Sequence, residues 1–242
     1  YLSKSNVTNI PDLISEHADN IKELESKIHN IKILDPACGT GEFLIRAIDV
    51  LLKISRAIQN HKEKSGKYSH TGKKKKSEYV TYATFDKDIE SQELRTIIQN
   101  NIFGVDINEE AIEITQLNLF LKLATSSKQL PDVSKNLRVG NALVDDPAVD
   151  PKAFDWEKVF PEKFDVVIGN PPYVFTRGKN FTKSEKKYFK NKIDSLGLKQ
   201  TKKGKNIQSG KLNLYGLFLL QCIPYLRNNA KLGFIVPNNI LR

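Results

Sequence analysis

Short apolar runs alternate along this chain with segments of helical period, and this alternation restricts the fold more than any other feature of the sequence. Helices are expected at residues 10–28, 42–58, 89–99 and 213–226, with another ending at 123 and some helix near 184–191. The apolar runs lie at residues 31–34, 101–106, 136–143, 164–170 and 231–237. Strands that alternate with helices are typical of an α/β protein with a doubly wound, mostly parallel sheet, and we predict that fold.

Positive charge exceeds negative charge and is concentrated in three runs. The chain has 38 Lys and Arg residues against 28 Asp and Glu residues, a net charge of +10, which favours a polyanionic partner. Residues 73–76 lie in a Lys-, Gly- and Ser-rich stretch, 61–77, that we interpret as a solvated surface insertion. The runs at 183–192 and 199–205 lie in a second insertion, 176–210, where we expect contact with a nucleic-acid backbone.

Several features bear on the class and location of the protein. The sequence has no apolar run long enough for a membrane span and no signal peptide. Two cysteines, Cys38 and Cys222, cannot form a disulfide scaffold, so we expect a reducing compartment such as the cytoplasm. The chain starts at Tyr1 and contains no Met, and we expect it to be a piece of a longer protein. No group of residues has metal-ligand spacing, so no metal site is predicted.

The loop DPACGTG, residues 35–41, leads from the first strand into the first long helix. Ligands of open α/β sheets collect at the carboxyl ends of the strands, and Gly39 and Gly41 would let a ligand approach the backbone closely. A tight strand-to-helix turn needs the same glycines. Leu44 stands where a dinucleotide fingerprint has its third glycine, and no Lys follows as in a phosphate loop. The Asp35 carboxylate suits a ligand that carries an ammonium or sulfonium charge.

Two further strand exits carry polar residues suited to a nucleoside. Asp106 ends the second strand, where a carboxylate can accept hydrogen bonds from both ribose hydroxyls. An Asp that caps the following helix explains this residue nearly as well. Asn141 follows the third strand and offers both a donor and an acceptor to an adenine edge, whereas a turn Asn is the simpler interpretation of this residue alone.

The fourth strand runs directly into Asn170-Pro171-Pro172-Tyr173. Its apolar run predicts a central strand, so a rigid loop after an edge strand explains this turn poorly. The amino group of a planar ring is a weak nucleophile because its lone pair is delocalised. The Asn170 oxygen and the Pro171 carbonyl, which the rigid prolines point outward, can accept both of its N–H groups. Tyr173 offers a flat face for an extruded base, so catalysis would rest on positioning and electrostatics.

Together these segments resemble the amino-group DNA methyltransferases that use S-adenosylmethionine, in the order of the gamma class of N6-adenine enzymes. The matching segments are DPACGTGEFL, FGVDIN, GNAL, FDVVIGNPPY, KLNLYGLFL and KLGFIVPNNIL, and the resemblance extends over residues 31–241. The similarity is greatest to the methylase part of type IIG and type IIS restriction–modification enzymes. It implies a Rossmann-like methyltransferase fold that ends after about the fifth strand, and methyl transfer to N6 of a flipped-out adenine in double-stranded DNA.

The resemblance also implies a domain organisation and a set of site residues. Residues 1–30 would be a helical lead-in and 31–242 a partial catalytic domain, with target-recognition and nuclease domains expected outside this sequence. Four residues of the glycine loop would line the methionine end of the cofactor, and Phe43 would pack near it. Asp106 would hold the ribose, and Ile107 and Asn141 would contact the adenine. The full cofactor set is Asp35, Ala37, Gly39, Gly41, Phe43, Asp106, Ile107 and Asn141, and the catalytic set is Asn170, Pro171, Pro172 and Tyr173.

Three other functions remain open at this point. A protein-glutamine N5 methyltransferase presents a similar planar amide to the same turn, but the basic runs that follow Tyr173 disfavour it. A non-catalytic cofactor- or nucleic-acid-binding module would not need the Asn-Pro-Pro-Tyr turn. A nicotinamide oxidoreductase would carry its acidic residue about 20 residues after the glycine loop, and Asp106 lies much further along the chain.

Overall fold

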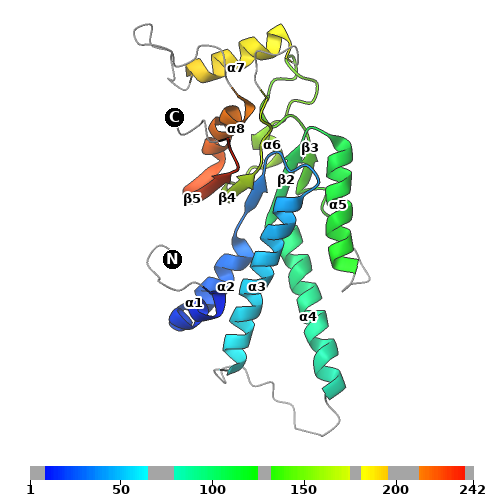
Figure 1. Cartoon of the computed structure of the whole chain (residues 1–242), viewed down its shortest axis with the longest axis vertical. Helices are drawn as coiled ribbons and strands as arrows, with labels where there is room; N and C mark the ends of the chain where they lie inside the picture. Colours follow the sequence, from blue (N-terminus) through cyan, green and yellow to red (C-terminus); the bar gives the residue numbers. More distant parts are fainter. Residues whose placement is uncertain (1–8, 65–78, 125–131, 175–180, 196–212, 238–242) are drawn as a thin grey trace.

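The computed structural model describes residues 9–64, 79–124, 132–174, 181–195 and 213–237, without the side chains of 63–64, 79–89 and 124. Within these residues, five strands form one sheet in the order β3-β2-β1-β4-β5, and all neighbouring strands are parallel (Figure 1). The strands are β1 Ile33–Asp35, β2 Ile102–Asp106, β3 Leu137–Val139, β4 Phe164–Gly169 and β5 Leu226–Phe234. The predicted doubly wound, Rossmann-like fold is therefore confirmed.

The order of the strands reverses between β1 and β4, which lie side by side in the middle of the sheet. All three residues of β1 are buried, as expected for a strand with elements packed on both faces. β4 pairs with β1 on one side and β5 on the other, so the prediction that it is an inner strand is also confirmed. In open α/β sheets, ligands bind in the crevice that lies outside the carboxyl ends of the strands at such a reversal.

The helices fall into two groups that cover opposite faces of the sheet. The first group contains α3 Glu42–Lys64, α4 Tyr79–Asn100 and α5 Glu109–Ala124, preceded by α1 Ile10–Glu16, the 3₁₀-helix η1 Ala18–Asn20 and α2 Ile21–Asn30. The second group contains α6 Trp156–Val159, α7 Lys183–Ser195, α8 Leu214–Cys222 and the 3₁₀-helix η2 Ile223–Tyr225. In Figure 1, α7 and α8 lie towards the end of the molecule to which the strands point, and α1 and α2 lie towards the other end.

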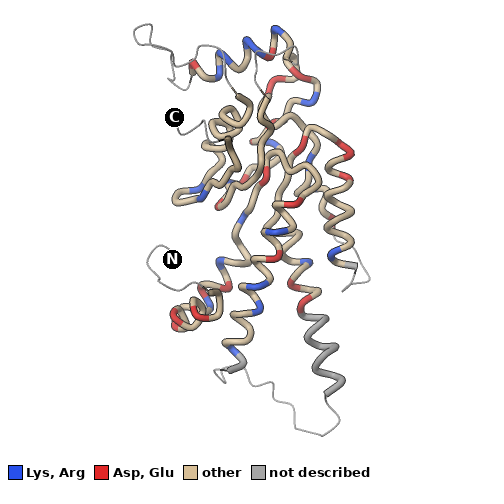
Figure 2. The backbone as a smooth tube through the Cα atoms, viewed as in Figure 1, with Lys and Arg blue, Asp and Glu red and all other residues tan. Residues whose placement is uncertain are grey.

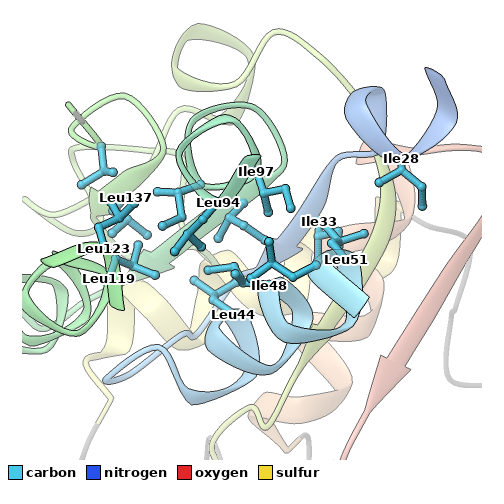
Figure 3. Packing of buried hydrophobic residues seen from close by; sticks show 14 of the residues in the cluster. Ile28, Ile33, Leu44, Ile48, Leu51, Leu94, Ile97, Leu119, Leu123 and Leu137 are labelled. Carbon is cyan, nitrogen blue, oxygen red and sulfur yellow. The ribbon is translucent and has the colours of Figure 1, made fainter. Parts of the chain in front are cut away.

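Each face has its own apolar cluster, because neighbouring residues of a strand point to opposite sides. Ile33 of β1 belongs to the first cluster and Leu34 to the second. The first, which we call the helical cluster, joins the sheet to α3, α4 and α5 (Figure 3). It includes Leu44, Ile48, Leu51, Leu94, Ile97, Leu119, Leu123 and Leu137. Ile14 and Ile28 also belong to it, so α1 and α2 are packed onto the same core.

The second cluster, the aromatic cluster, fills the other face with interlocking rings. Its ring centroids lie 4.8 to 6.1 Å apart, mostly in edge-to-face arrangements. These rings belong to Phe103, Phe154, Trp156, Phe160 and Phe164. The buried Trp156 also donates its indole N–H to the carbonyl of Ala142, 2.9 Å away. The cluster therefore fixes the loop that follows β3, in which the expected site residue Asn141 lies.

The structure differs from the predicted elements in several places. The helix expected at 10–28 is broken at Ala18–Asn20, where a polar stretch interrupts the apolar spacing and Asn and Asp favour turns. α3 continues to Lys64, into the expected insertion at 61–77, while 65–77 lie outside the described residues. α4 begins at Tyr79, earlier than expected, and the short α6 was not predicted.

The last strand also begins earlier than its apolar run. Leu226 pairs with Phe164 and Lys231 with Val166, so the residues between Leu226 and Lys231 bulge out of the ladder. Asn229 has a φ of +65°, a conformation that Asn adopts more readily than most residues. Hydrophobicity alone missed this polar bulge.

Among the described helices, none is both long and apolar enough to cross a bilayer.

Candidate active site

The ends of β1 and β4 meet at Asp35 and Gly169, the residue before Asn170. A methyl group placed on Gly169 would lie only 2.6 Å from the Asp35 Oδ1 atom, so only glycine permits this approach. The glycine loop and the Asn-Pro-Pro-Tyr turn, far apart in sequence, therefore meet at the carboxyl edge of the sheet, where the crevice of this fold class lies. This is the juxtaposition that the proposed site requires.

Asp35 is a buried carboxyl group with one of its two oxygens engaged. Its Oδ1 accepts the N–H of Ala37 at 3.1 Å, while Oδ2 is buried and has no partner among the described residues. Burial raises the pKa of Asp35 to about 7; the hydrogen bond from Ala37 opposes this shift and the charge of Asp106 adds to it. A buried carboxyl group that lacks a partner fits a ligand that brings a positive charge or an N–H donor.

Asp106 connects the exit of β2 to the glycine loop. Its Oδ2 accepts the N–H of Gly39 at 2.8 Å and its Oδ1 accepts the N–H of Asn108 at 2.9 Å. The residue that caps α5 is Asn108, whose Oδ1 accepts the N–H of Glu110, so the capping role considered for Asp106 belongs to its neighbour. Asp106 thus lies at the edge of the crevice, and its contact with a ribose remains a prediction.

Two residues of α5 that were not among the predicted site residues hold the glycine loop by hydrogen bonds. The hydroxyl of Thr115, which is fully buried, donates to the carbonyl of Gly39 at 2.8 Å. The side-chain amide of Asn118 donates to the carbonyl of Thr40 at 3.0 Å. Their spacing of three residues places both on one side of the helix, but the sequence contains no signal that this side faces the loop.

The loop has the backbone conformation that its glycines allow. Gly39 and Gly41 have φ values of +53° and +84°, in the left-handed region that other residues avoid. A Cβ atom at Gly41 would lie 2.6 Å from Thr115, whereas no atom lies within 4 Å of the same position at Gly39. Gly41 is therefore required by packing and Gly39 borders open space.

The remaining cofactor candidates lie around the same loop but differ in how open they are. Ile107, directly after β2, is 48% exposed. Phe43, in the first turn of α3, and Ala37 are half-buried, and Phe43 belongs to neither apolar cluster. Exposed or half-buried apolar side chains beside a crevice suit contact with an aromatic ring.

Asn141 uses its side chain to hold its own loop. Its Oδ1 accepts the N–H of Leu143 at 3.1 Å, and its Nδ2 donates to the Asp150 carboxylate at 2.6 Å. This is the turn role that the sequence analysis considered, and Asp150 is a partner that only the tertiary structure reveals. The Oδ1 and Nδ2 atoms of Asn141 can each form one more hydrogen bond. The contact of Asn141 with an adenine therefore remains a prediction.

The Asn-Pro-Pro-Tyr turn places its first residue in the open. Asn170 is exposed, Pro171 is buried and Pro172 is exposed. The Asn170 Oδ1 lies 2.5 Å from the Tyr173 hydroxyl, which also lies 3.0 Å from the carbonyl of Ile235. Of the described residues, none donates a hydrogen bond to the Pro171 carbonyl. The two acceptors expected to bind an amine are thus an exposed amide oxygen and an unengaged carbonyl.

The strand and helix that follow the turn hold it in place. Ile235, just after β5, donates its N–H to the carbonyl of Gly169 at 3.0 Å. The ring of Tyr173, 43% exposed, makes an edge-to-face contact with Tyr215 of α8, with centroids 6.2 Å apart. Tyr215 was not among the predicted site residues, and its contact with Tyr173 depends on how α8 packs.

The cysteines and the metal-binding residue types add no further chemistry. Cys38 and Cys222 are buried free thiols, and burial raises the pKa of both, that of Cys222 to about 12. Neither is therefore a ready nucleophile. Within the described part of the chain, His, Cys, Asp and Glu nowhere form a group of three that could hold a metal ion.

Comparison with known proteins places the chain in a family. The model of the Eco57I restriction-modification methylase family matches residues 100–242, more than half of the chain. The chain belongs to the Eco57I restriction-modification methylase family. A second model, of the RMKL-like methyltransferase domain, matches residues 24–133, which include the glycine loop. The resemblance drawn from the motifs is thereby confirmed.

Named relatives of this Eco57I-family chain are much longer proteins. It is 29% identical to the type II restriction enzyme and methyltransferase RM.Eco57I of Escherichia coli over 96% of the chain, but over only 22% of that relative. It is 24% identical to the adenine-specific methyltransferase PglX of Streptomyces coelicolor, over 71% of the chain and 14% of the relative. The chain therefore spans less than a quarter of either relative.

Solved structures confirm the fold of the Eco57I-family chain. The type IIL restriction-modification enzyme MmeI, in complex with DNA, matches 93% of the chain and 27% of its own chain at 16% identity, with a TM-score of 0.56. The DrdV–DNA complex matches 97% of the chain and 20% of its own chain at 17% identity, with a TM-score of 0.54.

Proposed function

We propose that this chain is the catalytic part of an S-adenosylmethionine-dependent DNA methyltransferase that methylates the N6 amino group of adenine, as the modification component of a restriction–modification system. The observation that carries the proposal is the position of the exposed Asn170 at the end of β4, directly after a glycine that contacts Asp35 at the end of β1. Membership of the family and an adenine-specific relative support the same reaction.

The residues around the glycine loop fit S-adenosylmethionine. The Asp35 Oδ2 atom lacks a partner, which suits the cationic methionine end of this cofactor, and the space at Gly39 is open. Asp106 has acceptor capacity left for ribose hydroxyls, and Ile107 is an exposed apolar side chain for the adenine. When bound, S-adenosylmethionine supplies an electrophilic methyl group on a sulfonium centre.

The turn would prepare the amino group as a nucleophile. The Asn170 Oδ1 and the Pro171 carbonyl each accept one N–H of the exocyclic amine, which draws electron density back onto its nitrogen. Tyr173 offers its ring face to the flipped-out base, and Tyr215 supports that ring from its edge. The rigid prolines fix the backbone that carries both acceptors, which limits its reorganisation during the reaction.

We also propose the domain organisation that the motifs predicted, with residues 1–30 as a lead-in and 31–242 as catalytic domain. Double-stranded DNA is the expected partner. The packing of α1 and α2 onto the helical cluster supports a structural role for the lead-in.

The direct test measures transfer of a tritiated methyl group from S-adenosylmethionine to DNA by the protein in its natural full length. We expect label on adenine N6, and a loss of at least about 100-fold in Asn170→Ala, because one of two fixed acceptors is removed. Asn60→Ala, the same substitution at an exposed residue of α3 away from the turn, is the control. Label on protein glutamine and none on DNA would replace this proposal with the glutamine reading.

A further inference from the structure

α7 carries four exposed lysines on one side. The first is Lys183, and the others follow it three, four and seven positions later, at Lys186, Lys187 and Lys190. The four side chains therefore occupy an arc of about 100° around the helix. We call these four residues the lysine stripe. Figure 2 shows basic residues along α7 at the end of the molecule to which the strands point.

The opposite side of α7 is attached to the protein, which leaves the stripe facing outward. Phe189 is buried in the aromatic cluster and its ring contacts those of Phe181 and Tyr188, with centroids 6.1 and 5.7 Å apart. The Tyr188 hydroxyl donates to the Asp145 Oδ1 at 2.7 Å. Lys192 lies on this inner side, 3.5 Å from the Asp145 Oδ2, and is not part of the stripe.

The start of α7 is fixed as well. Thr182 and Glu185 form a reciprocal capping box, in which the Thr182 N–H donates to Glu185 Oε2 at 2.7 Å and the Glu185 N–H donates to Thr182 Oγ1 at 3.1 Å. The carboxylate nearest to the stripe in sequence is therefore engaged at the helix terminus. Capping and anchoring together make the stripe a preorganised row of charges.

The location of α7 relates the stripe to the crevice. Asp145, which anchors α7, lies in the loop that follows β3 and contains Asn141. We infer that the lysine stripe binds the phosphate backbone of the DNA duplex whose base enters the crevice; this inference rests on the function proposed above.

Lys183 and Lys190 are seven residues apart, about 10 Å along the helix axis. A duplex carries about six phosphate charges over that length on its two strands together, so the four lysines can neutralise part of the backbone that they face.

The chemistry of the stripe defines what it contributes. Lysine ammonium groups bind phosphates as point charges and read no base sequence. The stripe should therefore orient the duplex and strengthen binding equally for all sequences. Since counterions are released from the duplex, its contribution must decrease as salt rises.

The test replaces the stripe by Lys183→Gln, Lys186→Gln, Lys187→Gln and Lys190→Gln in the full-length protein. A matched control replaces four exposed lysines on α2, α3 and the amino ends of β3 and β4, namely Lys22, Lys53, Lys135 and Lys163, also by Gln. Both variants lose four positive charges. Binding to a duplex of random sequence is measured between 50 and 300 mM KCl, and circular dichroism checks folding.

We expect the plot of log affinity against log salt to become shallower by about 2 to 3.6 for the stripe variant, since each neutralised phosphate contributes about 0.9. The control should retain the wild-type slope, and a stripe of four arginines should restore it. Equal slopes in wild-type and stripe variant, or equal losses in both variants, would overturn the inference. The inference would also be overturned if the stripe variant lost affinity for single-stranded RNA but kept its affinity for the duplex. If wild-type protein binds duplex but transfers no methyl group to it, the proposed function fails separately from the stripe.

Discussion

At the scale of single residues, the site depends on one buried carboxyl group and one exposed amide. Asp35 is completely enclosed and has a pKa near neutrality, whereas Asn170 is open to solvent but already has a donor at its oxygen. The first residue costs stability at neutral pH, and the second is engaged until a target displaces its partner. The first property can be measured on the unliganded protein, and the second in assays with DNA.

Asp35→Asn should make the unfolding free energy less dependent on pH. Because burial raises the Asp35 pKa from 3.8 to about 7, the folded state binds this proton more tightly than the unfolded state. Its stabilising effect is complete below pH 3.8 and is lost as pH rises through 7. Relative to wild type, Asp35→Asn should gain about 2–3 kcal/mol between pH 5 and pH 8. Urea unfolding at both pH values checks this, and an equal difference at both would contradict it.

Tyr173→Phe should separate the two roles of this side chain. The phenol competes with the target amine for the Asn170 Oδ1, while the ring is the expected stacking surface. Loss of the hydroxyl removes a hydrogen bond worth about 1 kcal/mol, so KM for DNA should decrease by up to about fivefold with kcat unchanged. Tyr173→Ala should instead raise KM. Steady-state methylation assays measure both, and a fall in kcat for the Phe variant would show that the hydroxyl takes part in the reaction.

At the scale of elements, α5 determines the shape of the glycine loop. Thr115 and Asn118 bind two successive carbonyls of the loop, and the Thr115 side chain occupies the space that a Cβ atom at Gly41 would need. The loop is therefore shaped by a helix that follows the next strand. This contact makes the two loop glycines unequal.

Gly41→Ala should destabilise the protein more than Gly39→Ala. Both substitutions impose a side chain on a positive φ, which costs about 1–2 kcal/mol. Only Gly41→Ala adds an overlap with Thr115, and it should cost about 1–3 kcal/mol more. Thermal unfolding of both variants gives the comparison. Combining Gly41→Ala with Thr115→Ser, which removes the methyl group, should recover part of the loss, and no recovery would show that the overlap is relieved otherwise.

At the scale of the whole molecule, one sheet is shared by two different cores. β1, β2 and β4 supply residues to both the helical cluster and the aromatic cluster, as Ile33 and Leu34 illustrate. If the strands unfolded from one cluster, the apolar residues of the other cluster would be exposed to water. The two faces should therefore unfold together.

The single tryptophan provides a test of this cooperativity. Trp156 is buried in the aromatic cluster, while far-UV circular dichroism reports mainly on the long helices α3, α4 and α5 of the opposite face. We expect the fluorescence and dichroism transitions in urea to coincide at one midpoint. Separate midpoints would show that the aromatic face unfolds on its own.

The strands, their polar exits, the glycine loop, the Asn-Pro-Pro-Tyr turn and the family could all be predicted from the amino-acid sequence, because apolar periodicity and turn chemistry are properties of neighbouring residues. Its errors, the break at Ala18–Asn20 and the bulge in β5, occur where polar residues interrupt that periodicity. Four contacts became visible only in the folded chain: Asp35 with Gly169, Thr115 with the glycine loop, Asp150 with Asn141 and Tyr215 with Tyr173. These contacts join residues far apart in the chain, and strand order and helix packing select them.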